Sequence, residues 1–285
     1  MLVYISADLE GISGVTRRDD LLPPGMDYPA ARRWLTLEVN AAVAGARAAG
    51  ATDFVVEENH GAELLCNLDL DLIDPEVDVV RGFPRGTTTT ISALTVECDA
   101  VFLVGHHACV GDPRGMMAHT ISGVFTDVRL DGRTVGEGEL IALAAAEVGV
   151  PTVLVTGDDV TAHQLSAVVP GIETAVVKTA LSGNGGRLMP PVRGAAMVQA
   201  AAERAIRRLQ DGHRPMAIPR GPSVLEIELS PLVDDLRALL ADVPGLALSG
   251  RTLTGKPETA ADAWRLGVHA ASVVMPALVA QYRKG

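Results

Sequence analysis

Short apolar runs alternate with amphipathic stretches along much of the chain, and this alternation predicts its fold. Runs of apolar and β-branched residues that indicate buried strands cover residues 2–7, 53–56, 100–104 and 152–156. Stretches with the spacing of helices cover residues 30–49, 139–148 and 160–169. In the first helix, Trp34 and Leu37 lie on the face that we expect to turn inward. Strands that alternate with helices predict an α/β fold with a mostly parallel sheet flanked by helices.

The later part of the chain carries a different pattern. Residues 128–130 and 133–135 flank Asp131-Gly132, a dipeptide typical of a type I′ hairpin turn. A Gly- and Pro-rich stretch at residues 182–194 indicates a boundary, followed by a helix at 195–210 and a strand at 225–229 with alternating glutamates. The last helix has a single apolar stripe, formed by Trp264, Val268, Ala271, Met275 and Leu278.

Two domains follow from these patterns. We expect a catalytic α/β domain over residues 1–192 and a smaller C-terminal α+β domain over residues 193–285. The second domain would cap the site or pack against another subunit. Asp158 and Asp159 precede the helix at 160–169, and either side chain is suited to cap it.

Composition narrows the classes of partner. The 285 residues are 48% hydrophobic but only 3% aromatic, so the chain can bury a large core made of small side chains. The formal net charge of −11 gives a surface that repels phosphate backbones, and we expect no nucleic-acid partner.

The beginning of the chain and its cysteines indicate a compartment. The first residues lack the basic start and cleavage site of a signal peptide, and no run of about 18 apolar residues predicts a membrane span. Cys66, Cys98 and Cys109 are an odd set without close spacing, which argues against a disulfide framework. A cytoplasmic protein is expected.

Side chains that carry chemistry follow the predicted strands. Asp8 and Glu10 leave the first strand two positions apart, so both carboxylates can face the same way. His60 follows the second strand, and the adjacent His106 and His107 follow the third. Adjacent imidazoles point in different directions, so only one of that pair is expected to be a ligand. Because ligands of open α/β sheets bind outside the carboxyl ends of the strands, these groups are expected to converge.

Two later residues complete the candidate site. His119 lies in the next loop and Glu137 follows the hairpin, although Glu137 and Glu139 could both simply favour the positive end of a helix. Carboxylates mixed with imidazoles suit zinc, and one aspartate can bridge two ions about 3.5–4 Å apart. Such ions polarise a scissile carbonyl and activate water, while His119 could move protons. Cys109 is either a thiolate or a small buried hydrophobe.

Several of these segments resemble the zinc-dependent D-aminopeptidases of the bacterial dipeptide-transport operon type. They are Asp8-Leu9-Glu10-Gly11-Ile12-Ser13-Gly14, His60-Gly61, Gly105-His106-His107-Ala108, Met117-Ala118-His119, Val135-Gly136-Glu137, Gly157-Asp158-Asp159 and Val177-Lys178. The similarity covers roughly residues 1–185. It implies two zinc ions per subunit bridged by Asp8, with Glu10 and His107 on one ion and His60 and Glu137 on the other. It also implies that His119 is the catalytic residue.

The resemblance further implies an activity and an assembly. Members of the family remove N-terminal residues, often D-amino acids, from short peptides, and they form ring-shaped homo-oligomers, so a decameric ring is one expectation. The chain departs from the family pattern at His106, where a tyrosine or an apolar residue is usual, and at Cys109. Two other functions stay open, namely a metal-dependent amidase acting on a non-peptide amide and a non-catalytic peptide-binding protein linked to peptide transport. A titratable His119 beside the ligands favours catalysis.

Overall fold

A seven-stranded sheet organises most of the chain in the computed structural model, which describes residues 1–61, 65–85, 91–219 and 221–282. In spatial order its strands are β3 (Asp78–Val80), β2 (Asp53–Glu58), β1 (Leu2–Ala7), β4 (Ala100–Val104), β7 (Thr152–Asp158), β8 (Glu173–Ser182) and β9 (Gly185–Leu188). All neighbouring strands are parallel except β8 and β9. The predicted α/β fold with a mostly parallel sheet is therefore confirmed.

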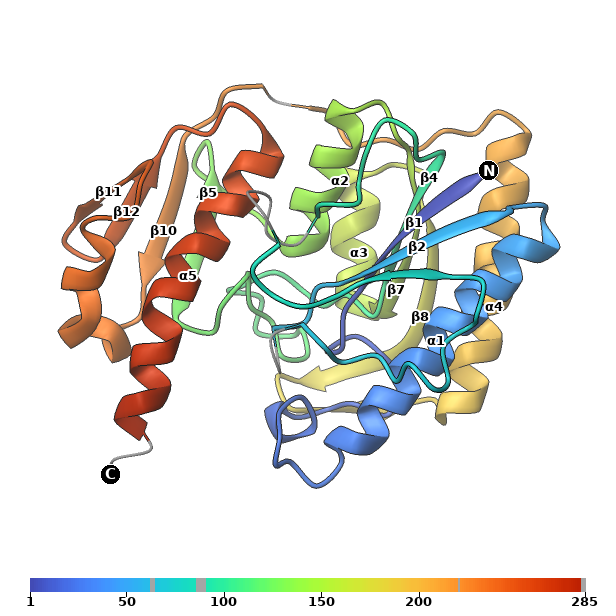
Figure 1. Cartoon of the computed structure of the whole chain (residues 1–285), viewed down its shortest axis with the longest axis horizontal. Coiled ribbons are helices and arrows are strands. Elements are labelled where there is room, and N and C mark those ends of the chain that lie inside the picture. The colour runs from blue at the N-terminus through green and yellow to red at the C-terminus, as the bar shows by residue number, and fades with distance from the viewer. Residues whose placement is uncertain (62–64, 86–90, 220, 283–285) are drawn as a thin grey trace.

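Helices cover both faces of this sheet (Figure 1). The helices α1 (Tyr28–Ala48) and α4 (Pro191–Gln210) pack together on one face, while α2 (Glu137–Glu147) and α3 (Asp159–Val168) lie against the other. Because successive side chains of a strand point to opposite faces, β1 and β4 contribute to both apolar cores. This double burial explains why these strands read as continuous apolar runs.

A second, antiparallel sheet lies beside the first (Figure 1). In spatial order its strands are β11 (Leu246–Ser249), β12 (Thr252–Gly255), β10 (Leu225–Leu229), β5 (Phe125–Leu130) and β6 (Arg133–Thr134). The helix α5 (Ala260–Tyr282) and the 3-10 segment η3 (Pro231–Leu240) pack against each other beside it. Asp131 and Gly132 have φ values of 51° and 77°, as a type I′ turn between β5 and β6 requires.

The elements of the two sheets cross the expected domain boundary. β5 and β6 belong to residues 1–192, yet they pair in the sheet that contains β10. The helix α4 lies almost wholly beyond residue 192, yet it packs against α1 and β8. Strand pairing and helix packing thus link residues 1–192 with residues 193–285. The division into two domains at this boundary stays a prediction.

Two predicted inward-facing residues are in fact exposed. Leu37 of α1 is 37% exposed, whereas its neighbour Glu38 is buried. Leu35 and Val39 face the core, and the helical period therefore directs Leu37 away from it. Met275 of α5 is 36% exposed at the edge of an apolar stripe that is narrower than the sequence predicts.

The helix α5 also bears on the expected absence of a membrane span. Among the described residues, Ala260–Ala280 is long and apolar enough to cross a membrane by length and composition, and 44% of its most apolar window is buried. This helix is not the uninterrupted apolar run that the expectation concerned, because it contains Asp262, Arg265 and His269. A core helix qualifies equally, and α5 packs against α2 and η3. That the chain has no membrane partner stays a prediction.

Candidate metal centre

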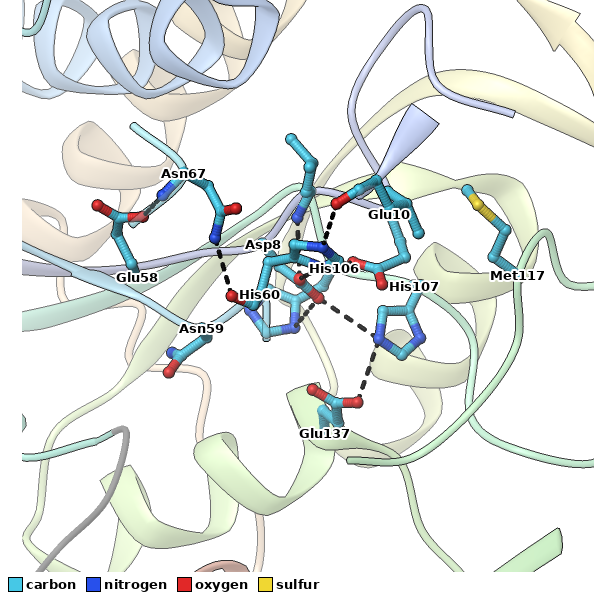
Figure 2. A network of polar contacts seen from close by, with 12 residues as sticks. Asp8, Glu10, Glu58, Asn59, His60, Asn67, His106, His107, Met117 and Glu137 are labelled. Atoms are coloured by element: carbon cyan, nitrogen blue, oxygen red, sulfur yellow. Dashed lines mark hydrogen bonds and ion pairs between the residues drawn. The ribbon is translucent and has the colours of Figure 1, made fainter. Parts of the chain in front are cut away.

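The carboxyl ends of β1, β2 and β4 meet the start of α2 at one buried place (Figure 2). The residues predicted as metal ligands all lie there and are at most 7% exposed: Asp8, Glu10, His60, His107 and Glu137. Glu137 is the first residue of α2, which begins two residues before the predicted start. The structure therefore brings these five side chains together from four separate segments.

Close backbone contact between two loops fixes the positions of Asp8 and His107. Gly11 N donates to Gly105 O at 2.7 Å, which joins the loop after β1 to the loop after β4. Gly105 has a φ of 73°, and a Cβ atom there would lie 2.1 Å from the carbonyl oxygen of Asp8. Only glycine permits both this backbone conformation and this approach.

The ligand atoms form two groups that share Asp8. In the first group, His60 Nδ1 lies 2.8 Å from Glu10 Oε2 and 3.7 Å from Asp8 Oδ1. In the second, His107 Nε2 lies 3.2 Å from Glu137 Oε1 and 3.4 Å from Asp8 Oδ2. Within each group the candidate ligand atoms lie within 4.8 Å of one another. Each oxygen of Asp8 therefore faces one group, as a bridging carboxylate must.

This grouping differs from the one that the resemblance implied. The resemblance placed Glu10 with His107 and His60 with Glu137, whereas the short contacts pair Glu10 with His60 and His107 with Glu137. A further group of Glu10, His107 and His119 also has metal-binding geometry. Which side chains share which ion stays a prediction.

Backbone carbonyls set the tautomers of the two candidate ligand imidazoles. His60 Nε2 donates to Leu21 O at 3.1 Å, and His107 Nδ1 donates to Ala108 O at 3.0 Å. A carbonyl only accepts, so these nitrogens carry the proton when the ring is neutral. His60 Nδ1 and His107 Nε2 are then free to bind a cation, which is the usual arrangement for metal-binding histidines.

His119 faces both groups without being part of the predicted ligand set. Its Nδ1 donates to Met117 O at 2.9 Å, and its Nε2 lies 3.6 Å from Glu137 Oε1 and 3.8 Å from Glu10 Oε1. The ring stacks on His107 with centroids 4.0 Å apart. Its side chain is 19% exposed, more than any of the predicted ligands, so Nε2 can exchange protons with a bound molecule.

The loop that carries His119 is held by Asp158. Asp158 Oδ2 accepts from Met116 N at 3.0 Å, while its Oδ1 accepts from Thr161 N at 2.7 Å and so caps α3. The prediction that Asp158 or Asp159 caps this helix is confirmed for Asp158. The same carboxylate thus ties the start of α3 to the loop before His119.

Burial and mutual charge perturb every acid in the cluster. Burial raises the pKa of Asp8 well above its usual value, and the neighbouring Glu10 raises it further. Burial also opposes ionisation of Glu137, but the neighbouring His107 and His119 together lower the pKa of Glu137 to about 2. Gathering carboxylates in a buried place is costly unless cations compensate them.

Two buried atoms at the centre of the cluster point to a cation. Asp8 Oδ2 and His107 Nε2 have no hydrogen-bond partner within the part of the chain that the structure describes. A divalent metal would satisfy both atoms at once, and a donor set of carboxylates with imidazoles suits zinc. The residues present therefore fit the expected metal.

The remaining candidates are not members of this ligand set. Glu139 pairs with Arg133, so Glu137 is the glutamate that faces the cluster. Burial raises the pKa of the Cys109 thiol, which disfavours a thiolate. Burial and the nearby His107 lower the pKa of His106 to about 4; its Nε2 lies 2.9 Å from Ser6 Oγ, and its Nδ1 lies 4.0 Å from Asp8 Oδ2.

Two residues that support the site could not be assigned from the sequence. Lys178 is buried and donates from Nζ to the carbonyl oxygens of Glu10 and, at 2.9 Å, Val15. Glu38 Oε1 accepts from Ser13 N at 2.8 Å. Both therefore hold the loop that presents Asp8 and Glu10. The only sequence signals are the match at Val177-Lys178 and an acidic residue beside the apolar face of α1.

Comparison with known proteins adds independent findings. The peptidase M55 family, described as D-aminopeptidase, matches residues 1–267. A D-aminopeptidase of Bacillus subtilis (strain 168) is 29% identical over 231 residues, which cover 81% of this chain and 82% of that protein. The solved structure of the Zn-dependent D-aminopeptidase DppA from Bacillus subtilis, described as a self-compartmentalizing protease, superposes with a TM-score of 0.87. It is 24% identical and covers 96% of this chain and 98% of its own.

Proposed function

Because the chain belongs to the peptidase M55 family of D-aminopeptidases, we propose that it is a dinuclear zinc aminopeptidase. It removes the N-terminal residue, including D-amino acids, from short peptides. The observation that carries the proposal is the position of Asp8, whose two oxygens face separate ligand groups. His119 lies beside both groups, as a catalytic acid or base would.

The ligand set would hold two zinc ions per subunit. The residues concerned are Asp8, Glu10, His60, His107 and Glu137. When bound, zinc supplies Lewis-acid polarisation of the scissile carbonyl and a water of lowered pKa. Zinc dependence is described for the structural relative DppA, and the donor set of this chain is consistent with it.

His119 is the residue through which protons move. Its Nδ1 is engaged by Met117 O, so Nε2 is the acceptor of a neutral ring and faces the carboxylates. This nitrogen can take a proton from the attacking water and return it to the departing amine. Stacking on His107 keeps the ring in that orientation.

Assembly and location complete the proposal. DppA is described as self-compartmentalizing, and an assembly that encloses its active sites would restrict substrates to short peptides. We infer that this chain forms a homo-oligomer, with the decameric ring as the specific expectation, and that it works in the cytoplasm.

The test combines metal content with turnover of D-Ala and L-Ala p-nitroanilides. We expect about two zinc per chain in the native protein. His119→Ala should retain this zinc but lose about 10²–10⁴-fold in kcat. His163→Ala, which changes an exposed histidine of α3, is the matched control and should leave both quantities unchanged.

Two outcomes would redirect the proposal. An N-acetylated substrate that is cleaved as fast as the free amine would identify an amidase rather than an aminopeptidase. Native protein that holds no metal and hydrolyses neither substrate, with added zinc, cobalt or manganese, would refute the enzyme and leave a peptide-binding protein.

A further inference from the structure

The imidazole of His106 is fully buried directly behind the shared carboxylate. It follows β4, and its two nitrogens face different neighbours. Nε2 lies 2.9 Å from Ser6 Oγ, whereas Nδ1 lies 4.0 Å from Asp8 Oδ2. Figure 2 shows His106 in the crowded centre of the site, with Asp8, His60 and His107 close to it in the view. The ring therefore adjoins the ligand set without belonging to it.

A short chain of hydrogen bonds determines which nitrogen of His106 carries the proton. Asn59 Nδ2 donates to Ser6 Oγ at 2.6 Å. Since the hydroxyl accepts from Asn59, its own proton is available to His106 Nε2. A neutral imidazole that accepts at Nε2 carries its hydrogen on Nδ1. The N–H of His106 thus faces Asp8.

The two atoms that face each other are otherwise without partners. Neither His106 Nδ1 nor Asp8 Oδ2 has a hydrogen-bond partner among the described residues, and both are buried. Their separation of 4.0 Å exceeds a direct hydrogen bond, but a shift of about 1 Å would close it. A carboxylate oxygen has two lone pairs, so Asp8 Oδ2 can accept from His106 while it also faces a cation beside His107.

We propose that His106 is a positioning residue whose Nδ1–H donates to Asp8 Oδ2 and orients the carboxylate that would hold both metal ions. This inference rests on the proposed function. Because Asp8 belongs to both ligand groups, loss of its orientation would weaken the binding of both metal ions together rather than the binding of one. Partners of metal ligands typically change metal affinity or activity by about 10–100-fold when they are removed.

Two substitutions separate the donor from the bulk of the ring. In His106→Asn, an amide nitrogen can occupy the place of Nδ1, so the donor toward Asp8 is retained. In His106→Gln, the amide reaches the place of Nε2 and the contact with Ser6, so that donor is lost. Ser6→Ala acts from the other side, since it removes the hydroxyl that keeps the proton on Nδ1.

The experiment measures zinc affinity by competition with a chelator, zinc per chain, and the visible spectrum of the cobalt-substituted protein. For His106→Gln we expect affinity about 10–100-fold weaker, with both ions lost in one transition and an altered cobalt spectrum. His106→Asn should stay within about threefold of native, and Ser6→Ala should fall between the two.

The outcomes distinguish this inference from the function on which it rests. If native protein holds two zinc ions and hydrolyses peptides while His106→Gln and Ser6→Ala bind zinc as native does, the positioning role is refuted and the function stands. Equal loss in His106→Asn and His106→Gln also refutes it, because the ring would then act by its volume. Native protein without zinc refutes both proposals.

Discussion

The two sheets of this protein treat charged side chains in opposite ways. At the strand ends of the seven-stranded sheet, carboxylates and imidazoles are buried, and atoms such as Asp8 Oδ2 have no hydrogen-bond partner among the residues that the structure describes. In the antiparallel region, where side chains are described for residues 125–134 and 221–280, Ser230 is the only buried polar residue. Charges there lie at the surface in pairs such as Arg251 with Asp234.

Topology explains this difference. Parallel strands end at one edge of a sheet, and their following loops can gather side chains from distant parts of the sequence. Antiparallel hairpins return at once and offer no such shared edge. Buried charge is costly, and acids and bases with strongly shifted pKa values cluster at functional sites, so the first region is where we expect the site, while the second supplies packing.

The largest expected effect removes the shared carboxylate of the first region. Asp8→Asn takes away the anionic bridge between the two ligand groups, and we expect kcat/KM to fall by at least about 10³-fold, beyond the range for partners of ligands. Peptide hydrolysis and zinc content measure the effect. Asp234→Asn, in the antiparallel region, is the control and should keep native activity. Full activity in Asp8→Asn would show that the cluster is not the catalytic centre.

The next effect is on stability alone. Leu253 of β12 is fully buried in the apolar core, and Leu253→Ala should lower the free energy of unfolding by about 2–5 kcal/mol. The folded fraction should keep native kcat/KM, because the cavity lies in the packing region. Urea unfolding and hydrolysis assays measure both quantities. Leu239→Ala, at a position 46% exposed, should change stability by less than about 0.5 kcal/mol.

A loss of activity that accompanied the loss of stability would contradict the assignment of the site to the first region and of packing to the second. If Leu253→Ala lowered kcat/KM of fully folded protein in proportion to stability, the antiparallel region would have to take part in shaping the site. The two sheets would then differ in how they bury charged side chains but not in their contribution to function.

Much of this contrast could be predicted from the sequence. The bounds of β1, β4 and β10 match the predicted residues, because buried or alternating apolar positions mark a strand locally. The convergence of Asp8 and His107 also followed from sequence, since both come directly after such strands. Membership of the D-aminopeptidase family, indicated by the motifs, is confirmed.

What could not be predicted depends on tertiary contacts. β3 spans only Asp78–Val80, and β9 begins with glycines, so neither has a readable period. The burial of Glu38 depends on its bond to Ser13, 25 positions earlier in the chain. Likewise, the orientation of the His106 ring depends on Ser6 of a neighbouring strand.

Asp74 is a carboxylate of the first region that is paired with an arginine. Its substitution tests whether a carboxylate affects activity because of the region in which it lies or because of its immediate environment. Arg47 of α1 binds Asp74 through two hydrogen bonds, of 2.7 and 3.1 Å. The bond from Arg47 lowers the pKa of Asp74, whose side chain is 18% exposed. Unlike Asp8, this carboxylate is fully partnered and lies outside the metal centre.

The smallest expected effect is therefore that of Asp74→Asn, which should cost about 1 kcal/mol of unfolding free energy at pH 7 and leave kcat/KM unchanged. Because the pKa of Asp74 is lower in the folded than in the unfolded state, its contribution is complete above the unfolded pKa of about 3.9. The difference between native protein and the variant should stay constant from about pH 7 to 5 and shrink as the pH falls below about 4. Urea unfolding across this range measures it. A difference that instead grew with acidity would reverse the assigned sign, and a loss of activity would extend the catalytic role beyond the unpartnered charges.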